Sequence, residues 1–464
     1  MDFIDLYLVP CAFTVASAVL WVFAHRSDSS VRLPLGVYAG TYLITTGIGG
    51  VAIGCTQGEV LEWMAWDINL NLLPDVNSFK YWGLLFAPLI IPPACIICFR
   101  SSHERIRASK RPTFNVNESV SPAALIGTFF LFGGYCLTML IVRGQALNIL
   151  LWSSLKGDYL SMIVQREVVS QSVGSAFFGI AYIALPTLSF VAVYQYYRQG
   201  TLSWRYTFML VVSGTLFIDL ELMQKAPSLL FLLFLGLALI ELKVLRLRAL
   251  AYIFGGLVGT LTVLQSMMYQ EWGWWQSIQL MVFRMAHGFP CYVNVYPEVL
   301  PFGGIETGLH LVGLGEPARD SFNVFDSMFP NVTWVQGALA APAHMRAYSQ
   351  AGVPYAIITL IIVGLIIKGI GAMRHRISGP ISFALFMQAL VFLYNLSQTS
   401  LRESVISCYG IFWAFIAIFP LLMLGDQKRA RHHTVLTSSV PTAKLSLKGR
   451  SRIKLDSCRP TPYW

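Results

Sequence analysis

Eleven apolar segments of membrane-spanning length constrain this chain more than any other feature. Each approaches the roughly 20 apolar residues that a helix needs to cross the hydrocarbon core of a bilayer. They lie near residues 3–24, 35–54, 81–99, 121–142, 173–195, 206–223, 227–242, 249–268, 353–373, 380–397 and 404–424. Because unpaired backbone groups are costly in lipid, such segments fold as helices. We therefore expect an all-α polytopic membrane protein with about 11 transmembrane helices.

The composition agrees with a membrane protein and not with a soluble enzyme. Hydrophobic residues make up 55% of the chain and charged residues 12%, whereas a soluble domain has about 25% charged residues. The eight cysteines are scattered, which excludes a disulfide framework and a zinc pattern. Asp2 and Asp5 precede the first apolar run in place of a positive region, so no cleavable signal peptide is expected.

The formal net charge of +10 reflects membrane orientation and does not indicate nucleic-acid binding. Lys and Arg gather in alternate loops, which the positive-inside rule places in the cytoplasm. These basic stretches are 26–32, 100–111, 198–205, 243–248, 374–376 and the C-terminal tail. The alternation predicts an outer N-terminus, a cytoplasmic C-terminus and an outer position for the long polar segment at 269–352.

The chain divides into one transmembrane domain, 1–425, and a basic tail, 426–464, that we expect to be disordered and cytoplasmic. Within the domain, residues 269–352 form the longest interruption between apolar segments. Loops of this length are usually functional or disordered. This one is rich in aromatic and hydrophobic residues, unlike a disordered segment. We expect a partly structured outer loop that carries the functional site.

Four cations, Arg166, Lys225, Arg284 and Arg402, each lie beside the outer membrane end of a different predicted helix. Arginine binds phosphate through two parallel hydrogen bonds and stays charged in a dry site. Gathered at one cavity, these cations would suit a lipid-linked pyrophosphate, and we assign Arg346 to the same binding role. The alternative is that each side chain reaches the headgroup level independently of the others.

His344 and Glu403 are the candidates for a general base. Histidine titrates near neutral pH, and Glu403 adjoins Arg402, which would keep it ionised. A helix around residue 344 would point His344 and Arg346 to different faces, whereas an extended stretch would point them to the same face. A surface histidine and a helix-capping glutamate are the structural alternatives.

The order of these parts resembles a known family. Arg166 precedes the span at 173–195, and a Gln224–Lys225 turn precedes the span at 227–242. Arg284 opens the long outer loop. The stretch 337–370 then resembles that family's short amphipathic segment, small-residue turn and exit helix, and Leu401–Arg402–Glu403 precedes the last span. This order resembles the Wzy-type O-antigen and common-antigen polymerases of bacterial envelopes, over roughly residues 150–425. Lys225 departs from the arginine that members often have near this position.

The resemblance implies a metal-independent glycosyltransferase of the bacterial inner membrane that uses no cofactor, in which the outer N-terminus predicted above is periplasmic. Such enzymes transfer a growing glycan from undecaprenyl pyrophosphate to the non-reducing end of a new lipid-linked repeat unit. The implied partners are undecaprenyl-pyrophosphate-linked oligosaccharide, the lipid bilayer and a chain-length-regulating co-polymerase, with no nucleic acid. An O-antigen ligase and a flippase or transporter of lipid-linked oligosaccharide remain alternatives. A flippase would line its path with charges, and the middle of the spans is nearly free of them.

Overall fold

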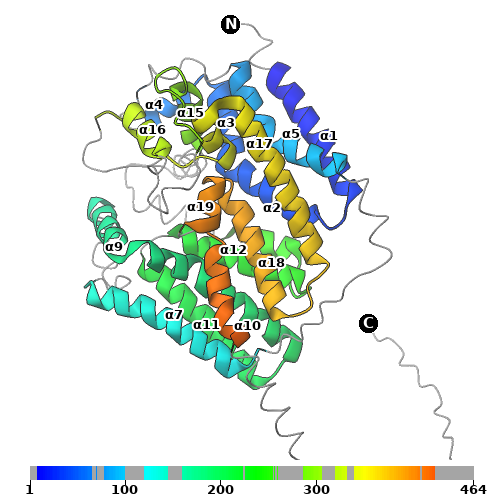
Figure 1. Cartoon of the computed structure of the whole chain (residues 1–464), viewed down its shortest axis with the longest axis vertical. Coiled ribbons are helices and arrows are strands. Elements are labelled where there is room, and N and C mark those ends of the chain that lie inside the picture. Colours follow the sequence, from blue (N-terminus) through cyan, green and yellow to red (C-terminus); the bar gives the residue numbers. More distant parts are fainter. Residues whose placement is uncertain are drawn as a thin grey trace, which may run out of the picture.

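The computed structural model describes residues 8–64, 69, 78–99, 120–144, 159–222, 225–253, 255–256, 259, 286–305, 319–331, 339–407 and 410–423 (Figure 1). These residues form helices and turns, and no strand occurs among them. Within the same ranges, six helices are long and apolar enough to cross a membrane. The all-α membrane class is therefore confirmed, and the number of eleven spans stays a prediction.

The helices follow the predicted spans closely over most of the chain. Helical segments coincide with the predicted spans other than 249–268, which lies mostly outside the described residues, and 404–424. The elements are α1 (Val9–Ser27), α2 (Arg32–Tyr42), η2 (Leu43–Gly47), α3 (Ile48–Cys55), α4 (Glu59–Met64), α5 (Phe79–Cys98), α7 (Pro122–Val142), α9 (Tyr159–Gly179), η4 (Ile180–Ala184), α10 (Leu185–Gln199), α11 (Leu202–Glu221), α12 (Lys225–Glu241), α15 (Gly288–Val295), α16 (Asp320–Met328), α17 (Ala343–Arg374), α18 (Pro380–Asn395) and α19 (Leu401–Ile406). A further apolar helix spans Phe412–Met423.

Two adjoining hydrophobic cores hold these helices together. The first is built by α7, α10, α11, α18 and the later part of α17, around residues such as Leu188 and Phe383. The second is built by α3, α5, α15, α16 and the start of α17, around Trp82 and Tyr292. In Figure 1 the first group lies below the second, and α2 lies between them and contacts α5, α17 and α18. The later, described part of the polar segment 269–352 thus packs onto the second core.

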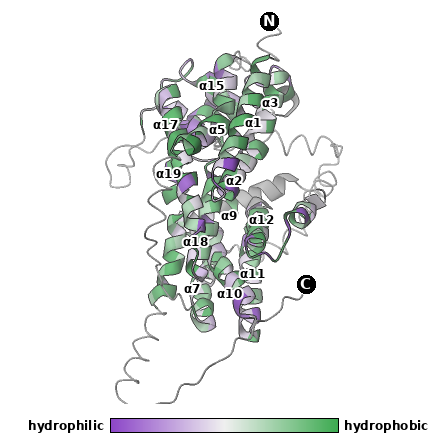
Figure 2. Cartoon of the chain, turned by 90° about the vertical axis from the view of Figure 1, so that its right-hand side faces the viewer, coloured by the Kyte–Doolittle hydropathy of each residue, from purple (hydrophilic) through white to green (hydrophobic). Residues whose placement is uncertain are grey.

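Apolar side chains also cover outward-facing surfaces. Large hydrophobic residues such as Phe23, Phe130 and Ile141 are exposed on α1 and α7. Figure 2 shows hydrophobic residues over most of the length of the helices, with hydrophilic ones in smaller groups. Exposed apolar surface of this extent is unfavourable in water and favourable in lipid. It supports a membrane location for the helical body.

Glycines in the second span allow α3 to lie close to α5. A Cβ atom at Gly54 would lie 2.4 Å from the Trp82 ring, and one at Gly50 would lie 2.5 Å from the Leu85 side chain. No side chain fits at either position without movement of its neighbour. The close contact buries the Trp82 and Leu85 side chains almost completely.

Helix α17 begins at Ala343, well before the predicted start of its span at residue 353. Its backbone breaks at Ala351 and Gly352, where Gly352 has φ +75°, and Pro354 follows inside the helix. A residue with a side chain would be strained at this φ. The break separates a short first part, which packs into the second core, from the long apolar part. His344 and Arg346 therefore lie on a buried helical turn.

The prediction of one continuous span at 404–424 is wrong. Helix α19 ends at Ile406, and the next helix begins at Phe412. Ser400 caps the start of α19, and Ser407 at its end is extended with ψ −173°. A Cβ atom at Gly410 would lie 2.4 Å from the Val405 carbonyl oxygen, so the chain doubles back at a glycine. Hydropathy alone missed this break because the residues around it are mostly apolar.

Candidate functional site

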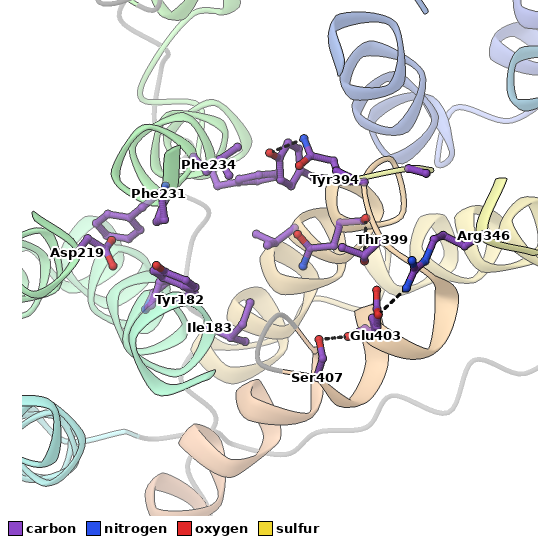
Figure 3. Close-up of a pocket in the computed structure, with 18 of the residues that line it drawn as sticks. Tyr182, Ile183, Asp219, Phe231, Phe234, Arg346, Tyr394, Thr399, Glu403 and Ser407 are labelled. Atoms are coloured by element: carbon purple, nitrogen blue, oxygen red, sulfur yellow. Dashed lines mark hydrogen bonds and ion pairs between the residues drawn. The ribbon is translucent and has the colours of Figure 1, made fainter. Parts of the chain in front are cut away.

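A cavity of about 540 Å³ lies where α10, α11, α12, α18 and α19 meet the chain before α17 (Figure 3). Its size is in the range of small-molecule binding sites, roughly 300–1,000 Å³. The residues that line it come from segments that are far apart in the sequence, from Tyr182 to Ser407. The cavity is thus a product of the whole fold.

The two sides of the cavity differ in chemistry. One wall is largely apolar, with the carboxyl group of Asp219 on α11 at its end, and its apolar residues come from α10, α12 and α18: Pro186, Phe190, Pro227, Leu230, Phe231, Phe234 and Val391. The other is polar and comes from α17, α18, α19 and the turn between the last two: Arg346, Asn395, Gln398, Thr399, Glu403 and Ser407. This division suits an amphiphilic ligand, with hydrocarbon on one wall and polar groups on the other.

Arg346 is the centre of the polar side. It is only 4% exposed. Its Nη2 donates to Glu403 Oε1 at 2.9 Å, and its Nη1 donates to the Tyr292 hydroxyl at 3.0 Å and lies 3.1 Å from Asp320 Oδ1. A buried cation needs such partners because removing it from water costs several kcal/mol. The guanidinium ties α15, α16, α17 and α19 together.

Glu403 has both a structural and a cavity-lining position. Ser400 and Glu403 form a capping box, in which the Ser400 side chain accepts from the Glu403 backbone and the Glu403 carboxylate accepts from the Ser400 backbone. Its Oε1 accepts from Arg346, and its side chain is 29% exposed at the cavity. Glu403 therefore caps helix α19, as the structural alternative predicted. The same carboxylate also faces the space where a ligand would bind.

Asp320 completes the network and was missed by the sequence analysis. It begins α16, is 4% exposed, and its Oδ2 accepts from the Ser349 hydroxyl at 2.8 Å. Burial raises the pKa of Asp320, and the Arg346 cation and the Ser349 hydrogen bond oppose this rise. The only signal in the sequence was an acidic residue at the start of a short helical segment in the long loop.

Arg346 is therefore largely neutralised by its own neighbours. Two carboxylates contact one guanidinium, and only the Arg346 Nε lacks a hydrogen-bond partner among the described residues. A pyrophosphate would have to displace Asp320 or Glu403 to gain the usual bidentate contact. Arg346 was predicted to bind phosphate. The geometry instead favours a role in which Arg346 holds the Glu403 carboxylate in position.

His344 lies outside the cavity. It is 1% exposed, and its Nε2 lies 3.1 Å from the Leu84 carbonyl oxygen. Because a carbonyl oxygen only accepts, Nε2 carries a proton and donates. The ring sits between Tyr42 and Phe289 in the second core. The segment is helical, so His344 and Arg346 point to different faces, and the structure brings Arg346, not His344, to the cavity.

The structure describes the other predicted cations only in part. Arg166 lies on α9 and Lys225 begins α12, two residues before the cavity-lining Pro227. The side chains of both, and the whole of Arg284, lie outside the described residues. Arg402 is the neighbour of Glu403 on α19 and is partly exposed. The expectation of one shared cationic site therefore stays a prediction.

Neither a metal site among the described residues nor a known relative identifies the function of this cavity. In the part of the chain that the structure describes, no group of three or more His, Cys, Asp or Glu side chains could hold a metal ion. The candidate site thus consists of the amphiphilic cavity and the Arg346 network. No protein-family model, curated protein or solved structure matches the chain.

Proposed function

We propose that this protein is a membrane-embedded glycosyltransferase that polymerises lipid-linked oligosaccharide repeat units at the periplasmic face. The observation that carries the proposal is the cavity with one apolar wall and one wall bearing an ion-paired carboxylate. A polyprenyl pyrophosphate carrying sugars has the same division between hydrocarbon and polar groups. The resemblance to Wzy-type polymerases supports the same reaction.

In this proposal the donor's first sugar lies near Glu403. An acceptor hydroxyl oxygen forms a bond to the anomeric carbon of the donor sugar, and the bond from that carbon to undecaprenyl pyrophosphate breaks. The pyrophosphate leaves with the bonding electrons, and cations stabilise its charge. Lys225, Arg166, Arg284 and Arg402 are the candidates for that role. Glu403 accepts the proton of the acceptor hydroxyl, and Arg346 holds the carboxylate in position.

The proposal requires the cavity to face the periplasm. Arg346 lies at the end of the segment 269–352, which the distribution of Lys and Arg places outside. A reporter enzyme that is active only in the periplasm should be active when fused after Asn323 and silent when fused after Lys110. The opposite pattern would reverse the orientation and exclude periplasmic polymerisation.

Deletion of the gene in its source bacterium should separate the proposed reaction from its alternatives. A polymerase deletion should remove the ladder of long surface glycans and leave single repeat units attached, because export and ligation continue. Surface glycan would be visualised by gel electrophoresis, with the wild-type gene on a plasmid as the control. Loss of all attached glycan would contradict polymerisation and indicate a ligase or a flippase.

A further inference from the structure

Asp219 occupies the opposite end of the cavity from the Arg346 network and has no role in the reaction described above. It lies near the end of α11, is 1% exposed, and lines the cavity. Its Oδ1 has no hydrogen-bond partner within the described ranges. Figure 3 shows Asp219 beside Phe231 and Tyr182, with Glu403 and Arg346 on the far side.

A buried carboxyl oxygen without a partner is unusual. Most buried polar groups in folded proteins form a hydrogen bond, and leaving one unsatisfied destabilises the fold by about 1–3 kcal/mol. Apolar residues would pack against Phe190, Phe231 and Phe234 without this cost. A carboxyl group at this position is therefore better explained by a ligand that supplies the missing hydrogen bond.

The side chains beside Asp219 indicate which class of ligand would fit this end of the cavity. Hydrocarbon would leave the Asp219 carboxyl oxygen unsatisfied. A sugar satisfies both parts of the surface, because its hydroxyl groups form hydrogen bonds with a carboxyl group and its C–H faces pack against aromatic rings. Tyr182 and Phe231 supply such rings at the cavity wall.

We propose that Asp219, Tyr182 and Phe231 form a sugar-binding subsite, in which the Asp219 carboxyl oxygen accepts a hydrogen bond from a hydroxyl group of the lipid-linked substrate. This inference rests on the proposed function, since it assigns the glycan of the same substrate to this end of the cavity. A buried polar group that bonds a sugar hydroxyl is a strong source of specificity, because the group is left unpaired when the hydroxyl is absent.

The subsite implies that Asp219 lowers stability in the absence of substrate. Replacing an unsatisfied buried carboxyl group with an apolar residue removes its desolvation cost, and an amide of the same shape costs no more to bury than the carboxyl group. Asp219→Asn and Asp219→Leu should therefore have unfolding temperatures equal to or above that of the wild type. A residue kept only for structure would show the opposite change. Residues kept for binding at the expense of stability are typical of functional sites.

The test uses the oligosaccharide of the organism itself. Mild acid would release the sugar from the lipid-linked repeat unit that accumulates in the deletion strain. Its dissociation constant with the purified full-length protein in detergent would be measured by titration calorimetry. Asp219→Asn should bind about tenfold to a hundredfold more weakly, as expected when a donor amide replaces one of the two carboxyl oxygens and a hydrogen bond is lost. Thr215→Val is the matched control, since Thr215 is buried one turn earlier on α11 and does not line the cavity.

Each possible result either supports or overturns the sugar-binding subsite. Weaker binding by Asp219→Asn, with an unchanged or higher unfolding temperature and a normal Thr215→Val control, supports the subsite. Unchanged binding, or weaker binding together with a lower unfolding temperature, overturns it. A wild-type protein that polymerises lipid-linked substrate in liposomes but binds no free oligosaccharide at millimolar concentration also overturns it. A wild-type protein that does neither overturns the proposed function as well.

Discussion

Replacing Arg346 with alanine is expected to destabilise the protein by about 3–5 kcal/mol, the usual effect of breaking a buried ion pair from one side, and to abolish polymer formation. The substitution leaves the Asp320 and Glu403 carboxylates without their cation and removes the donor to the Tyr292 hydroxyl. Most of the loss should come from Asp320, because Glu403 is 29% exposed and water can reach it. Thermal and denaturant unfolding of the purified protein would measure the loss of stability.

Two further variants distinguish loss of the cation from loss of packing. Arg346→Lys keeps the charge but cannot reach Glu403 and Asp320 through separate nitrogens, so it should recover only part of the stability. Adding Asp320→Asn to Arg346→Ala should recover stability too, because one unpaired carboxylate is removed, and the pair then shows non-additive effects. An Arg346→Ala protein as stable as the wild type would show that the network does not hold α15, α16, α17 and α19 together.

The pH dependence of this loss should reveal the carboxylate responsible. Burial already raises the pKa of Asp320, and the Arg346 cation opposes that rise. Without the cation, Asp320 takes up a proton at a higher pH, and the protonated form is less costly to bury. The difference in stability between the wild type and Arg346→Ala should therefore shrink as the pH falls through the pKa of Asp320.

Hydropathy predicted the helices better than it predicted where they break. Apolar length located α5 and α7 almost to their ends, because both lie in unbroken apolar runs. The break at Gly352 lies directly before residue 353, where the apolar span was predicted to begin, so hydropathy located it. The break at Gly410 lies within an apolar run, so the same measure did not detect it. Both breaks shape the candidate site, since Arg346 lies before the first and the second follows the helix that bears Glu403.

The site was predicted only in part, for a physical reason. Arg346 and Glu403 were selected from charge near the membrane ends, and both line the cavity. Their partner Asp320 is joined to them only through tertiary packing, and no spacing in the sequence relates the three. His344 was selected as a candidate base for its titration range, but its ring is buried against the Leu84 carbonyl and away from the cavity. Intrinsic chemistry suggested candidates, and packing selected among them.

Replacing Glu403 with glutamine is expected to slow polymerisation by about 10²–10⁴-fold, the range for loss of a general base. Glutamine has nearly the same shape, can also serve in a capping box, and keeps a carbonyl oxygen for the Arg346 hydrogen bond. It cannot accept the proton of the acceptor hydroxyl. The initial rate of chain extension would be measured with purified protein in liposomes that contain lipid-linked repeat units.

The capping role and the base role of Glu403 predict different results for this one substitution. If the residue only caps α19 and pairs with Arg346, glutamine should retain most of the rate and lower the unfolding temperature slightly. If it accepts the proton, the rate should fall while the unfolding temperature and donor binding stay close to wild type. Glu298→Gln is the matched control, because Glu298 is exposed and does not line the cavity. A full rate in Glu403→Gln would remove Glu403 as the base and leave Arg346 and Glu403 as a structural pair that closes one end of the cavity.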